Sequence, residues 1–113
     1  MPVLTVNQVS NTGLSMITDG VAADVGGDQF ANNGNTYISV ENGDVSPTTL
    51  TFTSTVLIDG DLTVADRDVI VAAGDFVTIG PFQKSIYDDG NDDVQVAYSS
   101  ITSLNVVVFQ RGS

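Results

Sequence analysis

The chain has 113 residues, the length of one domain, and its 42% hydrophobic and 15% charged residues exclude a disordered tail. Three Lys and Arg residues stand against fourteen Asp and Glu residues, a formal net charge of -11, so no basic patch can form for nucleic acid or an anionic membrane. Cys and His are absent, which excludes disulfides and thiolate chemistry and removes the commonest general base.

The first part of the chain predicts strands around a long loop. Period-two alternation predicts strands at residues 3–9 and 36–42, with a short strand at 14–18. Residues 19–34 predict a polar, glycine-punctuated loop with a single turn at 28–32.

Residues 48–58 show the clearest alternation. Leu50, Phe52 and Val56 fall on one face, and the opposite face carries Thr49, Thr51, Thr53 and Thr55. Threonine favours strands and is also wettable, so the pattern predicts an antiparallel strand with one face in water.

The second half predicts two pairs of strands. Residues 68–73 and 76–82 flank an Ala-Gly-Asp turn and predict a hairpin. Two further strands are expected at 94–98 and 104–110, and the apolar run 106–109 predicts that the last strand is the most central.

These elements predict the fold class. There is no helical pattern of useful length, and about eight short strands are separated by turn signals. The prediction is all-β, a single-domain antiparallel β-sandwich of jelly-roll or other Greek-key type over residues 1–113. Residues 1–9 are interpreted as an amino-terminal strand or arm and 111–113 as a tail or vector scar, while scattered aromatic residues are interpreted as core.

An acidic loop at residues 88–93 is the sharpest polar cluster. Its candidate calcium ligands are Asp88, Asp89, Asn91, Asp92 and Asp93. An EF-hand starting at Asp88 would need glycine sixth and glutamate twelfth, but Asp93 and Ser99 stand there. The default interpretation is a solvated hairpin tip, with a non-EF calcium site as the alternative, and no cofactor is predicted.

The inventory of catalytic groups predicts a protein that is not an enzyme. Lys84 is the only lysine, so the abundant Ser and Thr hydroxyls lack an activating base. The Asp-Thr-Gly and Asp-Ser-Gly signatures of aspartic proteases are also absent. Lys84 is interpreted as a strand-edge lysine that discourages edge pairing.

Several short segments together carry a resemblance to a known family. They are residues 4–6 (Leu-Thr-Val), 26–34 (Gly-Gly-Asp-Gln-Phe-Ala-Asn-Asn-Gly), 37–38 (Tyr-Ile), 41–44 (Glu-Asn-Gly-Asp), 79–82 (Ile-Gly-Pro-Phe) and 94–98 (Val-Gln-Val-Ala-Tyr). With these segments the chain resembles the small β-rich head decoration, or cement, proteins encoded near the major capsid protein of tailed bacteriophages. The resemblance implies a non-enzymatic virion protein that binds the capsid exterior and reinforces contacts between capsid subunits, commonly as a homotrimer.

The partners follow from this interpretation. The expected partner is the major capsid protein of a tailed phage, with no nucleic acid and no membrane. Residues 1–5 lack the charged segment and apolar run of a secretory signal, so synthesis in the host cytoplasm is expected. Predicted partner contacts lie in the amino-terminal arm and the 19–35 loop, at Val3, Leu4, Val6, Phe30, Asn32 and Asn33.

Alternatives remain open at this point. Phe30, an aromatic residue in a polar loop, is either an anchor packed under its own loop or a contact for a partner. The whole chain is alternatively a carbohydrate-binding or adhesive β-module with Asp-lined calcium loops, or a phage tail or head–tail joining protein.

Overall fold

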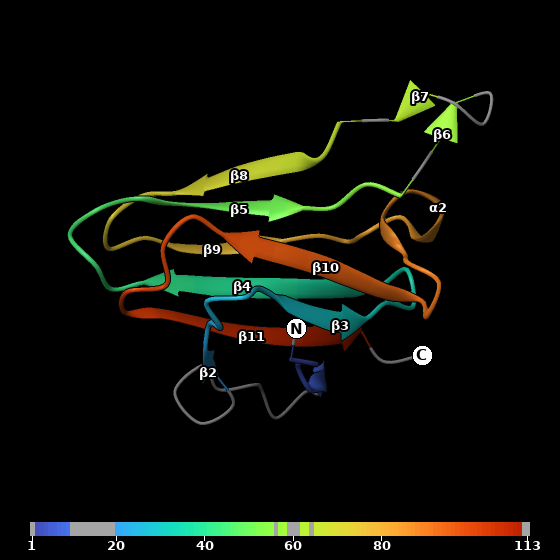
Figure 1. The fold of residues 1–113 in the computed structure, drawn as a ribbon. Helices are drawn as coiled ribbons and strands as arrows, with labels where there is room; N and C mark the ends of the chain where they lie inside the picture. The colour runs from blue at the N-terminus through green and yellow to red at the C-terminus, as the bar shows by residue number, and fades with distance from the viewer. Residues whose placement is uncertain (1, 10–19, 56, 59–61, 64, 112–113) are drawn as a thin grey trace.

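The structure is a computed structural model that describes residues 2–9, 20–55, 57–58, 62–63 and 65–111. Two β-sheets lie face to face, with a core of apolar side chains between them (Figure 1). The predicted all-β sandwich is therefore confirmed.

The strands divide between the sheets as follows. One sheet contains β1 (Val6–Val9), β2 (Val21–Ala22), β11 (Leu104–Arg111), β4 (Thr36–Asn42) and β9 (Phe76–Ile79). The other contains β3 (Asp28–Ala31), β10 (Asp93–Tyr98), β5 (Thr48–Phe52) and β8 (Arg67–Val71). A small ladder of β6 (Leu57–Ile58) and β7 (Leu62–Thr63) and the helix α2 (Lys84–Tyr87) complete the described elements.

The strand order is that of a jelly roll. One sheet runs β2–β11–β4–β9 and the other β3–β10–β5–β8, and every neighbouring pair is antiparallel. From β2 to β11 successive strands alternate between the sheets, except β5 and β8, which pair within one sheet. This is the double Greek-key connection of a jelly roll. The strand β1 adds a parallel pairing to β11 beside β2.

The core follows from the period-two pattern. In β5, Thr48, Leu50 and Phe52 point inward and are buried, while Thr49 and Thr51 face outward, which confirms the predicted threonine face. Facing side chains come from β4 and β11 of the other sheet, β10 adds inward side chains beside those of β5, and an aromatic cluster closes one end of the core. That cluster consists of Phe30, Phe52, Phe82 and Tyr87, with ring centroids 4.9 to 5.6 Å from that of Phe82.

The prediction that residues 104–110 form the central strand is also confirmed. β11 pairs with β4 along one edge and with β1 and β2 along the other. Val106, Val107 and Val108 are consequently buried although they alternate between the two faces of the sheet.

The predicted hairpin between 68–73 and 76–82 is wrong. β8 pairs with β5 and β9 pairs with β4, so the turn between them crosses from one sheet to the other. Gly74, at φ +74°, makes this crossing, and its N–H donates to the Asn42 carbonyl at 2.8 Å. Local turn chemistry is the same for a hairpin and for this crossing, and only the partner strands distinguish them.

The long loop predicted at 19–34 is also wrong in part, because it contains β2 and β3. In β3 the side chains of Asp28 and Phe30 both point inward, so a carboxylate stands where the pattern expects an apolar residue. The Tyr98 hydroxyl donates to Asp28 Oδ2 at 2.7 Å, a contact between distant segments that satisfies the buried carboxylate.

Two further features differ from the prediction, and one prediction is not covered by the structure. The strand expected over 48–58 ends at Phe52, since the Ser54 N–H donates to Asp66 Oδ1 at 2.9 Å and the Thr55 N–H donates to the Ile86 carbonyl at 2.7 Å instead of continuing the ladder to β8. Helix α2 was not predicted, and Lys84 is its first residue rather than a strand-edge residue. The strand predicted at 14–18 lies outside the described residues.

Candidate partner-binding surface

The amino-terminal arm closes one side of the sandwich. Residue Val3 forms an isolated parallel bridge with Gln29 of β3, and two backbone hydrogen bonds of 2.7 and 2.9 Å hold it there. The chain then crosses to the other sheet, where β1 pairs with β11. The arm therefore covers edges of both sheets, and its strand begins at Val6 rather than at the predicted residue 3.

The predicted contacts in the arm have different environments. Leu4 is buried in the core, Val6 is half-buried against it, and Val3 is 65% exposed. Leu4 therefore builds the domain in this conformation, and Val3 is the predicted arm contact with the most free surface.

The predicted partner contacts in the 19–35 loop are mostly buried within the domain. Phe30 is fully buried against Phe82, which corresponds to an anchor rather than a partner contact. Asn32 is also buried, and its Nδ2 donates to the Phe82 carbonyl at 3.1 Å and to Asp88 Oδ1 at 2.7 Å. Asn33 is exposed and donates to Gln110 Oε1 at 2.9 Å. Of these three residues, only Asn33 is exposed and accessible to a partner.

The acidic loop uses its first carboxylates to organise the chain. Asp89 Oδ1 accepts the N–H groups of Asn91 and Asp93 at 2.8 and 3.1 Å, and Oδ2 accepts from Gln95 Nε2 at 2.9 Å. The hydrogen bond from Gln95, followed by those from Asn91 and Asp93, lowers the pKa of Asp89 below its usual range. The pKa of Asp93 is raised, by partial burial and then by the charge of Asp89.

Asp88 ties this loop to α2 and β3. Lys84 Nζ donates to Asp88 Oδ2 at 2.6 Å and to the Asn32 carbonyl at 2.7 Å, and the bond to Asp88 raises the pKa of Lys84. Among the described residues no three acidic side chains are grouped so that they could hold a metal ion. The loop residues named as calcium candidates are thus placed together, but Asp88 and Asp89 face internal donors.

Three exposed apolar side chains lie toward the side of the sandwich opposite the arm. Ile70 of β8 is 70% exposed and Phe76 of β9 is 50% exposed, and Val45, in the β4–β5 connection, is 91% exposed. By strand register, Ile70 lies on the outer face of one sheet and Phe76 on the outer face of the other. We call these three residues, with the free edges of β8 and β9, the open side.

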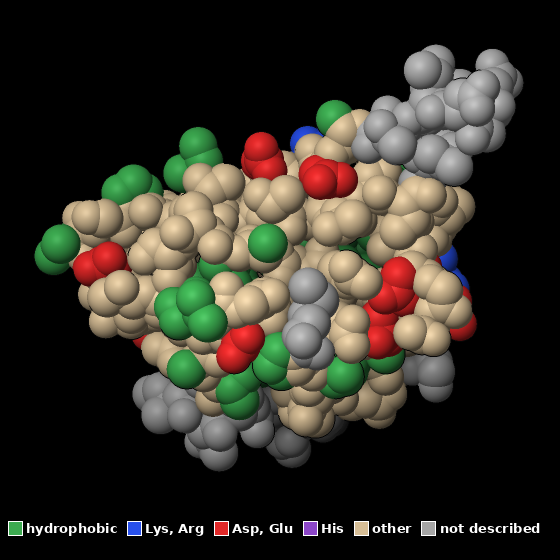
Figure 2. All heavy atoms as spheres, viewed as in Figure 1, with side chains coloured by type: hydrophobic (Ala, Val, Ile, Leu, Met, Phe, Trp, Pro, Cys, Tyr) green, Lys and Arg blue, Asp and Glu red, His purple; other side chains and the backbone are tan. Residues whose placement is uncertain are grey.

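The open side also has unpaired backbone. In the described chain β8 pairs only with β5 and β9 pairs only with β4, so one edge of each strand faces outward. Such edges present N–H and C=O groups to which another chain can add hydrogen bonds. Figure 2 shows hydrophobic side chains at the left end of the molecule, where β8 ends and β5 begins. Uncharged polar groups and backbone cover much of the sheet formed by β3, β10, β5 and β8.

Sequence reasoning missed the open side. Phe76 was interpreted as core, but it is paired opposite Glu41 on the outward face. Val45 carried a usable signal, since an apolar residue in a Gly-Asp-Val-Ser-Pro turn has no strand to bury it. Ile70 carried no such signal, because its exposure depends on β8 being an edge strand.

The chain was also compared with known proteins. No protein-family model, no curated protein and no solved structure matches it. Among the described residues, no helix has the length and apolar character needed to span a membrane.

Proposed function

We propose that the chain is a structural virion protein that binds the outer surface of a tailed-phage capsid and bridges neighbouring subunits of the major capsid protein. The proposal includes assembly as a homotrimer on the shell. The observation that carries it is a difference between the two sides of the sandwich. The arm covers one side, whereas the open side keeps free strand edges and exposed Ile70 and Phe76.

The open side has the composition of a contact surface. Aromatic and large aliphatic side chains that lose water on binding supply most of the energy of protein interfaces. Backbone groups at the free edges of β8 and β9 can add hydrogen bonds without requiring any particular partner sequence. A surface of this kind suits a repetitive partner that presents the same contact many times.

The shape and charge of the molecule are consistent with covering a shell. The chain is a slab with extents of 43 × 35 × 20 Å, so its broad faces cover much area for few residues. Its net charge of -11 would favour a capsid surface that carries Lys and Arg.

The test uses shells assembled from the major capsid protein encoded in the same genome. We expect the double substitution Ile70→Asp and Phe76→Asp to reduce the copies bound per shell by about tenfold or more, since it places charge at two apolar contacts. Bound copies are counted by quantitative mass spectrometry after density-gradient purification.

The control is Val25→Asp, which adds one negative charge, against two in the double variant, at an 80% exposed valine in the β2–β3 turn, outside the open side. It should bind like the unmodified chain. Equal binding by the double variant, or equal loss in the control, would remove the open side as the shell contact. A third variant, Val3→Asp, tests the exposed residue of the arm in the same assay.

A further inference from the structure

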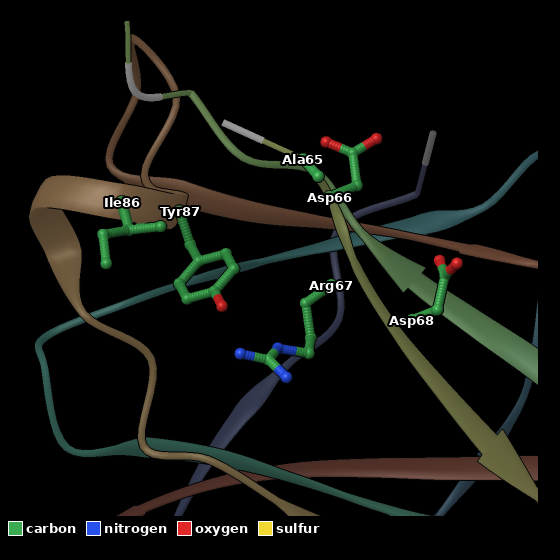
Figure 3. Close-up of a pocket in the computed structure, with 6 residues that line it drawn as sticks. All are labelled: Ala65, Asp66, Arg67, Asp68, Ile86 and Tyr87. Carbon is green, nitrogen blue, oxygen red and sulfur yellow. The ribbon is translucent and has the colours of Figure 1, made fainter. Parts of the chain in front are cut away.

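A hollow of about 390 Å³ opens between the start of β8 and helix α2 (Figure 3). It is lined by Ala65, Asp66, Arg67, Asp68, Ile86 and Tyr87. The hollow lies at the end of the sandwich where β5 leaves the sheet, so its walls come from two segments that are distant in sequence. It therefore exists only in the folded chain.

The position of Arg67 directs its side chain toward this hollow. Arg67 pairs with Phe52 across the β5–β8 ladder, and Phe52 points into the core. Paired residues on neighbouring antiparallel strands point to the same face of a sheet, so Arg67 leaves β8 on the inner side, at the open end of the core. Figure 3 shows its guanidinium extending beneath Tyr87, on the side to which the Tyr87 hydroxyl also points.

The two carboxylates beside Arg67 are engaged elsewhere. Asp66 Oδ1 accepts the Ser54 N–H at 2.9 Å, and Asp68 Oδ1 accepts the Thr51 hydroxyl at 2.8 Å. Figure 3 shows both carboxylates directed away from the guanidinium. Within the described part of the chain, the guanidinium of Arg67 makes no hydrogen bond and no ion pair, although Arg67 is one of only three cationic residues in the sequence.

The aromatic wall of the hollow is rigidly placed. Tyr87 packs edge-on against Phe82, with ring centroids 5.6 Å apart and an interplanar angle of 85°. Phe82 is itself buried against Phe52. The phenol is consequently held near the guanidinium by the core, which reduces the ordering cost of binding a ligand between them.

We propose that this hollow binds a single carboxylate carried by an acidic segment of a neighbouring polypeptide. A guanidinium fork donates two parallel hydrogen bonds to a carboxylate, and a phenol can donate a third. Asp66 and Asp68 on either side, together with the charge of the whole chain, disfavour a dianion such as phosphate more than a singly charged group. The site is a property of the isolated chain and does not depend on the shell-binding proposal.

The experiment titrates the full chain with the α-methylamide of N-acetylglutamate, which carries one carboxylate, and, separately, with the neutral α-methylamide of N-acetylglutamine and with inorganic phosphate. The readouts are the Nε–Hε resonance of Arg67 and the backbone amides of residues 86 and 87. A saturable shift is expected with the glutamate methylamide and none with the glutamine methylamide. Absence of saturation, or phosphate binding as tight as that of the carboxylate, would overturn the proposal.

Variants identify the groups responsible. Arg67→Gln should abolish the saturable shifts at residues 86 and 87, and Tyr87→Phe should weaken binding about three- to tenfold through loss of one hydrogen bond. Arg111→Gln makes the same change in net charge and should bind normally. Loss of binding in this control equal to that in Arg67→Gln would show a general charge effect and overturn the site.

Sedimentation equilibrium then distinguishes the source of the carboxylate. If the unmodified chain self-associates and Arg67→Gln alone lowers its mass, the carboxylate belongs to a second copy. If the mass is the same in both while the glutamate methylamide still binds the unmodified chain, the carboxylate belongs to a different protein.

Discussion

At the scale of single residues, Asn42 joins the two connections that support the open side. Its buried Nδ2 donates to the Ser46 and Val71 carbonyls at 3.0 and 3.2 Å, and its Oδ1 accepts the Asp44 N–H at 3.0 Å. We expect Asn42→Ala to lower the free energy of unfolding by about 2–4 kcal/mol, because buried backbone groups lose their partner.

Urea denaturation followed by circular dichroism measures this loss. The control is Asn91→Ala, at an exposed residue of the acidic loop, which should change stability by about 0.5 kcal/mol or less. Similar losses of unfolding free energy in the two variants would show that the Asn42 hydrogen bonds do not stabilise these two connections.

Tyr98 is expected to make the free energy of unfolding fall as the pH rises above 10. Burial of its ring, then its hydrogen bond to Asp28 and the nearby carboxylate charges, raises the pKa of Tyr98 above the ordinary 10.0. Below pH 10 the phenol is protonated in both states, so its contribution is fully present. Above pH 10 the unfolded chain releases a proton that the folded chain retains, so stability falls as pH rises, by at most about 1.4 kcal/mol per pH unit.

The free energy of unfolding is measured for the unmodified chain and for Tyr98→Phe, at neutral pH and at successive pH values from 9 upward. The variant should be less stable at neutral pH, because Asp28 loses a donor, yet show a shallower decline above pH 10. All other ionisable groups are common to both proteins, and parallel curves would refute the role of Tyr98.

At the scale of elements, the amino-terminal arm is part of the fold as well as a predicted contact. Removing residues 2–9 would uncover the β3 edge at Gln29 and the β11 edge, and would remove Leu4 from the core. We expect a melting temperature lower by about 10 °C or more, since burial of Leu4 alone contributes about 2 kcal/mol.

Calorimetry measures the shift, and hydrogen exchange at Gln29, whose N–H donates to the Pro2 carbonyl at 2.9 Å, should accelerate in the truncated chain. Val3→Asp serves as the control that keeps the arm but changes its exposed residue. An unchanged melting temperature after truncation would mean that the arm is not docked in solution.

The acidic loop offers a second test at this scale. Asp88 and Asp89 accept hydrogen bonds from Lys84, Asn32, Gln95 and the loop backbone, so calcium would have to displace these donors. We expect the melting temperature to be the same in millimolar calcium as in millimolar magnesium. A rise specific to calcium would favour the calcium-dependent binding module.

At the scale of the whole molecule, the proposal predicts a property of particles. A protein that bridges capsid subunits stabilises the assembled shell by mass action, so shells saturated with the chain should melt at a higher temperature than bare shells. Differential scanning calorimetry measures this, with the Ile70→Asp and Phe76→Asp double variant as the control that should give no rise. Equal melting of bare and saturated shells would contradict reinforcement.

Much of the architecture could be predicted from local pattern. Alternation in β5 and the apolar run in β11 are local properties, because side chains of a strand alternate whatever its partner. They were enough to predict an all-β sandwich, the threonine face and the central strand. The partners of β8 and β9 could not be read in this way, since an edge strand and a crossing turn are defined by distant segments.

The division between sequence and tertiary structure is clearest at the surface. Composition by itself determined the strand-rich class, the acidic charge and the lack of histidine and cysteine. Only the fold decided that Phe30 is buried while Phe76 is exposed, because burial depends on which strand lies opposite. Likewise, only the fold brought Arg67 and Tyr87 to one hollow, since twenty residues of chain separate them and their proximity depends on the packing of α2 against the end of the sandwich.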